Sequence, residues 1–181
     1  MSTDEIRLIE RAKQGDPTAF AELYDRYQPA IYRYIYYRVS DNDTAEDLTA
    51  EVFVRLVEKI DRFTYKGRPL LTWLYTIARN LITDHHRRAG RSLPLYVDEQ
   101  RISQEADPVK TVEERLRHRR LVAAIHCLTE DQQQVILLKF VEDLDNATVA
   151  QTLGKTVGAV KSLQHRALAA LRRSLEQSGG K

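Results

Sequence analysis

The sequence predicts an all-α protein made of two small helical domains joined by a flexible linker. Apolar residues recur at spacings of three and four along most of the chain, which is the period of an amphipathic helix. The 7 glycines and 5 prolines fall mostly where these periodic segments end. The periodicity is lost between residues 89 and 112, a stretch too long for an ordinary connection within one compact domain. We therefore expect domains over residues 1–88 and 113–181, with residues 89–112 as the linker.

Composition narrows the class of protein further. The chain has 181 residues, of which 43% are hydrophobic and 30% charged, so it can bury a core but is too short for a large barrel enzyme. The 28 basic and 26 acidic residues give a net charge of only +2, yet residues 155–181 hold 6 of the basic residues and 1 of the acidic ones. This positive C-terminal end is where we expect a polyanion to bind.

Capping signals divide the first domain into four predicted helices. Ser2 and Glu5 form a capping box for a short helix, and Asp16 stands before Pro17 as the N-cap of a second helix, which Pro29 is expected to kink. Asn42 or Asp43 is expected to cap the third helix, and Gly67 and Pro69 precede the fourth. The predicted core stripes are Phe20, Leu23, Tyr24, Tyr27, Ile31, Tyr34 and Ile35, then Leu48, Val52, Leu56 and Val57, then Leu70, Leu74, Ile77, Ala78 and Leu81.

The second domain is also predicted to contain four helices. A charged helix carries Leu116, Leu121, Val122 and Ile125, and Thr129 with Gln132 forms a capping box for the next helix. Asp145 is expected to cap a short helix that ends at Gly154, and Thr156 to cap the last one. The apolar face of that last helix is predicted to comprise Val157, Val160, Leu163, Leu168, Leu171 and Leu175.

Residues 145–175 have the plan of a helix-turn-helix, in which the second helix enters the major groove of DNA. The face opposite the apolar one displays Lys155, Ala159, Lys161, Ser162, Gln164, His165 and Arg166. Arg and Lys suit guanine edges and Gln suits adenine, while small residues can touch thymine methyl groups. The alternative interpretation is a helical hairpin with a solvated basic face.

Three segments resemble the extracytoplasmic-function (ECF) sigma factors, small members of the sigma-70 family of bacterial RNA polymerase sigma factors. The segment TEDQQQVILLKFVEDLDNATVAQTLGKTVGAVKSLQHRALAALRR is similar to their C-terminal DNA-binding region. AEDLTAEVFVRLVEKIDRF resembles the helix that docks on the polymerase clamp, and GRPLLTWLYTIARNLITDHHRR resembles the segment that reads and melts the −10 promoter element. The matches cover most of residues 5–88 and 113–175, in the family's order.

The resemblance implies a promoter-specificity subunit with three sets of site residues. Lys155, Thr156, Ala159, Lys161, Ser162, Gln164, His165 and Arg166 would bind the −35 element; Phe63, Lys66, Arg68, Arg79, Asn80, His86, Arg87 and Arg88 would bind the −10 element; Asp47, Leu48, Glu51, Val52 and Phe53 would bind core polymerase. The implied partners are the clamp of the largest polymerase subunit, the flap of the second-largest subunit, promoter DNA and an anti-sigma factor. No cofactor is implied.

Some of these residues have a second interpretation. Phe63 and Asn80 would line a pocket for a flipped base, but Phe63 can equally close the core and Asn80 can be a polar surface residue. The chain also departs from the family at Ala50-Glu51, where members often carry Gln-Glu, and at Thr129, which replaces a common proline. We expect these departures to alter detailed contacts rather than abolish binding.

Tyrosines are concentrated between residues 24 and 37, including the run YRYIYYR. Tyr32, Tyr36 and Tyr37 cannot all face the same core, so we expect an aromatic surface that holds an inhibitory partner or a second subunit.

Other function classes have little support. No metal site is expected, because the neighbouring His85 and His86 point in different directions on a helix. The single cysteine, Cys127, is interpreted as a small core residue, and no catalytic motif indicates an enzyme. The N-terminus lacks a signal peptide and no apolar run is long enough to cross a membrane, so we expect a cytoplasmic protein. A stand-alone helix-turn-helix repressor or activator remains the alternative to a sigma factor.

Overall fold

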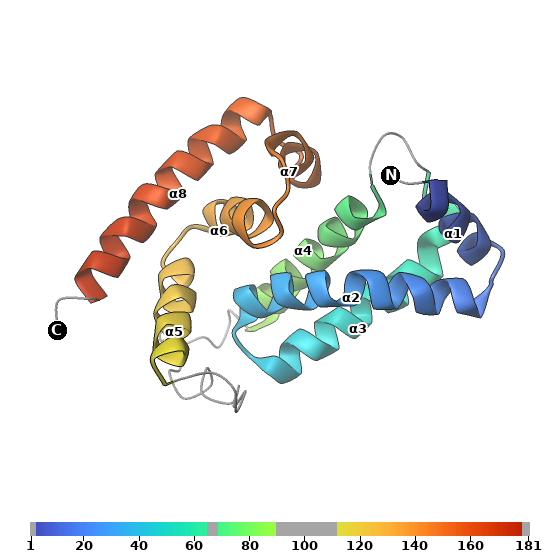
Figure 1. The fold of residues 1–181 in the computed structure, drawn as a ribbon, viewed down its shortest axis with the longest axis horizontal. Coiled ribbons are helices and arrows are strands. Elements are labelled where there is room, and N and C mark those ends of the chain that lie inside the picture. Colours follow the sequence, from blue (N-terminus) through green and yellow to red (C-terminus); the bar gives the residue numbers. More distant parts are fainter. Residues whose placement is uncertain (1–2, 65–68, 90–111, 179–181) are drawn as a thin grey trace.

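The computed structural model of the chain describes residues 3–64, 69–89 and 112–178 (Figure 1). The described residues form helices joined by short turns and contain no strand. This confirms the predicted all-α class. The expected linker falls almost entirely on residues 90–111, which lie outside the described residues.

The first helical group is built around α2 (Pro17–Val39), which packs against α1 (Thr3–Lys13), α3 (Asn42–Lys59) and α4 (Leu70–Ala89). A short 3₁₀ turn, η1 (Ile60–Arg62), follows α3. The helix α2 continues through Pro29. Leu23, Ile31, Leu56, Leu70 and Leu74 are among the side chains fully buried between these helices.

The second group contains α5 (Val112–His126), α6 (Glu130–Ile136), α7 (Asn146–Leu153) and α8 (Val157–Ser178). A five-residue π-helical segment, η3 (Leu137–Val141), extends α6. The long helix α8 packs across α5, α6 and α7. Ile125, Leu137, Leu138, Val149 and Val160 are buried at the centre of this group.

Side-chain caps fix several helix starts as predicted. The Asp16 carboxylate accepts from the Thr18 backbone N–H at 2.9 Å, and the Gln132 side chain accepts from the backbone N–H of Thr129 at 3.1 Å. The cap of α3 was predicted one or two residues late: Asp41 accepts from the Thr44 N–H at 2.9 Å. The box expected at Ser2 lies outside the described residues.

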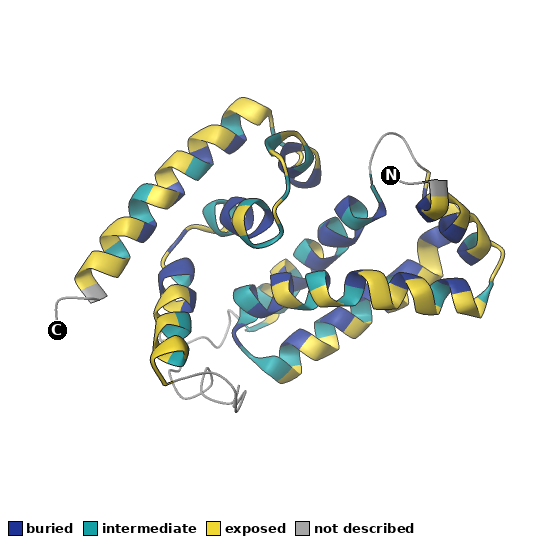
Figure 2. Cartoon of the chain, in the orientation of Figure 1, coloured by how far each residue is buried: buried dark blue, intermediate teal, exposed yellow. Residues whose placement is uncertain are grey.

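Several residues predicted to face the core are exposed instead (Figure 2). They are Tyr24, Val57, Leu116, Leu121, Val157, Leu168 and Leu175. Periodicity gives the direction of an apolar stripe but not how far the neighbouring helices cover it. Cys127 is also exposed rather than buried in the core.

The tyrosine cluster is largely covered by the chain itself. Tyr36 is 6% exposed, and its ring stacks on His118 of α5 with centroids 6.4 Å apart. Tyr37 also contacts the His118 ring, and both Tyr32 and Tyr37 are half-buried. The expected aromatic surface is therefore only partly available to a partner, because the second helical group covers part of it.

The conformation of Gly154 is expected to control the stability of the second group. Gly154 ends α7 with φ +64°, in the left-handed region where a Cβ costs about 1–2 kcal/mol. Gly154→Ala should lower the free energy of unfolding by about 1 kcal/mol, because no atom lies within 4 Å and only the backbone conformation opposes the methyl group. Denaturant unfolding followed by circular dichroism would measure the change.

Gly158 supplies a matched control. It lies within α8, and an added Cβ would meet only the Thr156 Oγ1 at 4.0 Å. Gly158→Ala should therefore stabilise the protein by about 0.5–1 kcal/mol. Equal effects of the two substitutions would contradict the assignment of the Gly154 cost to its backbone.

Candidate nucleic-acid interface

Local hydrogen bonds cap the starts of both α7 and α8. At the start of α7, the Asp145 carboxylate accepts from the Thr148 N–H at 2.7 Å, and this bonding lowers the pKa of Asp145. At the start of α8, the Thr156 hydroxyl accepts from the Ala159 N–H at 3.1 Å. Gly154 joins the two helices in the left-handed conformation. The first turn of α8 is thus presented in a fixed orientation at the edge of the molecule.

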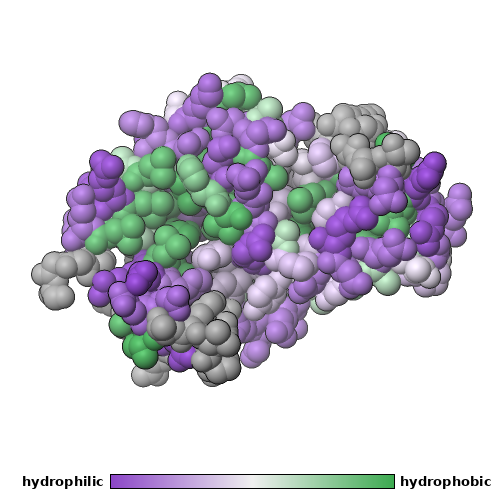
Figure 3. All heavy atoms as spheres, in the orientation of Figure 1, coloured by the Kyte–Doolittle hydropathy of each residue, from purple (hydrophilic) through white to green (hydrophobic). Residues whose placement is uncertain are grey.

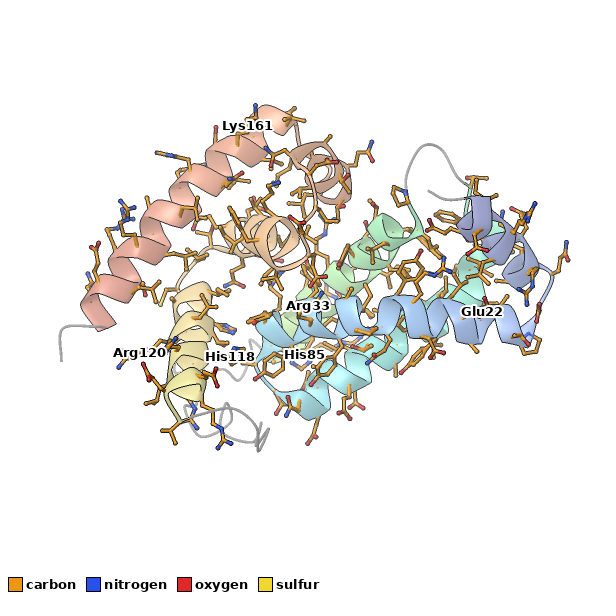
Figure 4. The ribbon with its side chains drawn as sticks, in the orientation of Figure 1. Glu22, Arg33, His85, His118, Arg120 and Lys161 are labelled. Carbon is orange, nitrogen blue, oxygen red and sulfur yellow. The ribbon has the colours of Figure 1, made fainter. Side chains whose placement is uncertain are left out.

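One side of α8 is polar, basic and open to solvent. Lys161, Ser162, His165 and Arg166 are exposed, whereas Val160, Leu163 and Ala167 of the same helix are buried. Lys161 lies on the outer side of α8 in Figure 4. These four exposed residues belong to the predicted −35 set and share a face that a DNA groove can reach.

The remaining members of that set are less accessible. Ala159 and Gln164 are half-buried, and Thr156 is exposed but serves as the helix cap. The Lys155 Nζ lies 2.9 Å from the Asp131 Oδ2 of α6, so this cation is already paired within the chain.

The predicted −10 residues on α4 are spread along the helix. Arg79 is half-buried and donates to the Leu153 carbonyl at 3.4 Å, while Asn80 is exposed. Arg87 is paired with Asp84 at 3.1 Å and Arg88 is exposed. His86 is half-buried, and burial followed by repulsion from Arg38 lowers its pKa. Lys66 and Arg68 lie outside the described residues.

Phe63 occupies a core position. Its side chain is 7% exposed and its ring lies 5.3 Å from that of Trp73, centroid to centroid. In this conformation the ring has no open face on which a flipped base can stack. The structure therefore supports the core interpretation of Phe63. Asn80 lines a cavity, and Phe63 is not among the residues that line it.

The exposed face of α3 differs in part from the predicted polymerase-binding set. Val52 is fully buried and Phe53 is 7% exposed, packed on Tyr24 at 4.7 Å, so neither offers an exposed apolar contact as expected. The reason is the helical repeat of α3, which places these two residues on the core side of the helix, opposite Asp47.

The apolar residues that α3 does expose are Val54 and Val57, at 50% and 55%. Helical spacing places Val54 on the same face as Asp47 and Glu51, because residues separated by three or four positions are neighbours on a helix. Glu51 is half-buried and pairs with Arg55 at 3.0 Å. Leu48 is half-buried beside this face. Counting the α3 stripe from Ala45 and Thr49, both buried, would have identified Val54 as outward-facing.

Within the described part of the chain, no three His, Cys, Asp or Glu side chains gather as a metal site would require. None of the described helices is long and apolar enough to cross a membrane.

Comparisons with known proteins agree with the two-part architecture. The sequence profile of Sigma-70 region 2 matches residues 23–92, and that of Sigma-70 region 4 matches residues 118–171. The ECF RNA polymerase sigma factor SigW of Bacillus subtilis is 32% identical over 179 residues, covering 92% of this chain and 94% of SigW. The chain belongs to the ECF sigma factor family.

A second relative of this sigma factor is the ECF RNA polymerase sigma factor BldN of Streptomyces coelicolor. It is 42% identical over 172 residues, which cover 94% of this chain but only 65% of BldN. Among solved structures, the sigma factor RpoE in complex with the anti-sigma factor NepR from Bartonella quintana is similar, with a TM-score of 0.68 and 25% identity. That likeness covers 87% of this chain and 96% of RpoE.

The two helical groups correspond to the two sigma-70 regions of the family. Region 2 spans most of α2, together with α3 and α4, and region 4 runs from within α5 to within α8. The exposed basic face of α8 therefore belongs to region 4, and the α3 and α4 faces to region 2.

Proposed function

We propose that this chain is the promoter-specificity subunit of a bacterial RNA polymerase, acting in the cytoplasm without catalytic activity of its own. Residues 1–88 would bind core polymerase and open the −10 element, residues 113–181 would bind the −35 element, and residues 89–112 would link them. The polymerase would supply the chemistry. The assignment follows from the family and from the faces that each helical group exposes.

The exposed basic face of α8 is the observation that carries the proposal. Lys161, His165 and Arg166 stand on the second helix of a helix-turn-helix, beside the short polar Ser162. Basic side chains on such a helix contact phosphates and guanine edges in the major groove. The net positive charge of residues 155–181 adds attraction to duplex DNA that does not depend on sequence.

Two apolar surfaces suit contacts with polymerase. On α3, Val54 and Val57 lie beside Asp47 and Glu51, which fits a basic and partly apolar surface such as we propose for the clamp. In region 4, apolar side chains gather alongside α8 next to α6, the green area of Figure 3. We propose that the flap of the second-largest subunit contacts this area. Exposed large apolar residues of α5 and α8 are Leu116, Leu121, Leu168 and Leu175.

An anti-sigma factor is the remaining proposed partner. The support is the similarity to RpoE, a sigma factor solved in complex with an anti-sigma factor. Because α5 covers part of the tyrosine cluster, the inhibitor is expected to use other exposed apolar residues of region 2 or region 4.

In-vitro transcription with purified core polymerase tests the proposal. A library of template sequences should yield promoter-dependent transcripts only when the protein is added. A stand-alone repressor or activator would instead bind a specific duplex without polymerase and would give no such transcripts. The absence of any protein-dependent transcript across the library would defeat the proposal.

Substitutions on α8 sharpen this experiment. Lys161→Ala and Arg166→Ala should each weaken promoter binding by the holoenzyme, and each lost phosphate contact should reduce the salt-dependence slope by about 1. Lys13→Ala is the matched control, because Lys13 pairs with Glu10 at 2.9 Å on α1, outside both proposed DNA-binding faces. An unchanged promoter affinity in both α8 variants would contradict the assigned binding face.

A further inference from the structure

A carboxylate of region 4 is enclosed by donors from region 2. Glu142, which follows the π-helical segment η3, accepts from the Arg33 Nε at 2.7 Å and from the Arg33 Nη2 at 2.8 Å. The Tyr75 hydroxyl donates to the same carboxylate at 2.9 Å. Arg33 lies on α2 and Tyr75 on α4, and the Glu142 side chain is only 3% exposed. One residue of region 4 thus joins two helices of region 2.

The backbone at η3 sets this contact. The Glu142 N–H donates to the Leu137 carbonyl at 3.0 Å, a bond across five residues, and Asp143 then takes a positive φ of 51°. A π-helical turn redirects the chain where an α-helix would continue, and such turns are frequent at functional positions. Here the turn ends directly at Glu142, the residue that contacts region 2.

A second group of contacts lies at the other end of the interface. Arg38, 2% exposed, donates to Glu130 of α6 at 3.3 Å, and Thr83 of α4 donates to the same carboxylate at 3.1 Å. The Ser40 hydroxyl is hydrogen-bonded to the His126 Nε2 of α5. Two of the three guanidinium nitrogens of Arg38, Nε and Nη1, are buried without a hydrogen-bond partner among the described residues.

Residues assigned to both promoter elements line one cavity between the regions. The cavity, of about 560 Å³, is bounded by Arg79 and Asn80 of α4 and by Lys155 in the turn between α7 and α8. Arg79 donates to the Leu153 carbonyl of α7, and Lys155 is paired with Asp131. The −10 and −35 elements are separated by about 25 base pairs, or roughly 85 Å at 3.4 Å per base pair. Residues that share one cavity cannot reach both elements at once.

We propose that the structure is a closed, self-inhibited conformation in which the Glu142 contact with Arg33 and Tyr75 holds region 4 over the DNA-binding side of region 2. This inference rests on the proposed function. Polymerase and promoter bind the open form, in which the two regions are separated. The measured affinity for DNA then equals the affinity of the open form multiplied by the fraction of molecules that are open.

The balance of the interface makes such opening feasible. Many of its contacts are polar, and separation returns the almost fully buried Glu142 and Arg38 side chains to water, which offsets much of the lost ion pairing. The incompletely paired Arg38 adds a cost to closure, because a buried charge without full hydrogen bonding is destabilising. The free-energy difference between the closed and open forms is therefore expected to be small enough for a partner to open the protein.

Small-angle X-ray scattering of the full chain tests the proposal directly. A compact chain of 181 residues has a radius of gyration of about 16 Å, and the wild-type protein should be near this value. Glu142→Ala removes the acceptor for Arg33 and Tyr75 together, so the radius of gyration should increase by several ångströms. Affinity for a short duplex of random sequence should rise at least about tenfold, as expected if fewer than about one molecule in ten is open in the wild type.

A charge exchange separates opening from misfolding. Glu142→Arg and Arg33→Glu should each open the protein, and the double variant should close it again, because a Tyr hydroxyl can accept from a guanidinium as well as donate to a carboxylate. Glu10→Ala, which breaks an ion pair inside α1, is the control and should leave the radius of gyration unchanged. Circular dichroism should show the same helix content in every variant.

An extended wild-type protein, or a Glu142→Ala protein as compact as the wild type, would overturn the inference. So would a double variant that stays open while retaining its helix content. Scattering requires neither polymerase nor promoter, so this test can fail while the transcription experiment succeeds. The reverse outcome, compaction that depends on Glu142 without any promoter-dependent transcript, would refute the proposed function alone.

Discussion

Phe63→Ala is expected to lower the free energy of unfolding of region 2 by about 3–5 kcal/mol, the range for removing a buried aromatic ring. Phe63 is 7% exposed and packs on Trp73 at a centroid distance of 5.3 Å. Removing the ring leaves a cavity beside Trp73 and takes away the aromatic pair. Phe63 follows η1 directly, so the loss also loosens the chain between α3 and α4.

Thermal or denaturant unfolding, followed by circular dichroism, would measure this effect. Phe140→Ala is a matched control, since Phe140 is 52% exposed and surface changes usually stay within about 0.5 kcal/mol. The alternative interpretation, a base pocket, gives the opposite pattern: promoter opening would fail while stability stayed near that of the wild type. A stable Phe63→Ala protein that binds promoter but cannot open it would therefore contradict the core assignment.

Helix caps and turns were the most predictable part of the fold, because they depend on residues that are close in the sequence. The caps at Asp16, Thr129 and Thr156 depend on side chains within three residues of the bonds they make, and the structure confirms all three. The turn at Gly154 is local in the same sense. At α3 the same reasoning was off by one or two residues, since Asp41, Asn42 and Asp43 are all good caps and only the backbone geometry distinguishes them.

Apolar stripes were predictable only at their centres. Val160 and Leu163 of α8 are buried as expected, whereas Leu168 and Leu175 are 44% and 41% exposed. Periodicity gives the direction of a stripe but not how far a neighbouring helix covers it, and α8 extends past the other helices of its group (Figure 1). Val54 of α3 is a different case, because the periodicity counted from Ala45 and Thr49 does place it on the outer face.

Contacts between the two regions could not be predicted from the sequence. Arg33 and Glu142 are 109 residues apart, and each alone is typical of a solvated charged residue. Tyr36 and Tyr37 gave a visible signal of an aromatic surface, but nothing local indicates that His118 of the same chain covers it. The structure supplies the pairing that turns these isolated signals into an interface.

Acidification is expected to open the closed conformation, because two half-buried imidazoles lie at the interface between the regions. His126 of α5 is bonded to Ser40, and its pKa is lowered by burial, then by repulsion from His86 and Arg38. The pKa of His86 on α4 is lowered by burial, then by repulsion from Arg38 and His85, although Glu130 of α6 opposes the shift.

The sign of the pH effect follows from these lowered values. Separation of the regions exposes the imidazoles to water and lets them regain an ordinary pKa of about 6.5, so the open form binds more protons. Above pH 6.5 both imidazoles are neutral in either form, so they do not oppose closure. Below pH 6.5 the free energy of closure becomes less favourable by up to about 1.4 kcal/mol per pH unit for each full proton that the open form takes up. Because His86 is less deeply buried than His126, its contribution is expected to be the smaller of the two.

Scattering between about pH 8 and about pH 5, a range that brackets the imidazole pKa, should show the radius of gyration rising as the pH falls. His126→Gln retains a hydrogen-bonding group toward Ser40 but cannot take up a proton, so it should flatten this dependence. His165→Gln is the control, because His165 is exposed on α8 and should not change the profile. A His126→Gln profile that matches the wild type would show that His126 is not the proton acceptor and would contradict the expected pH effect at this residue.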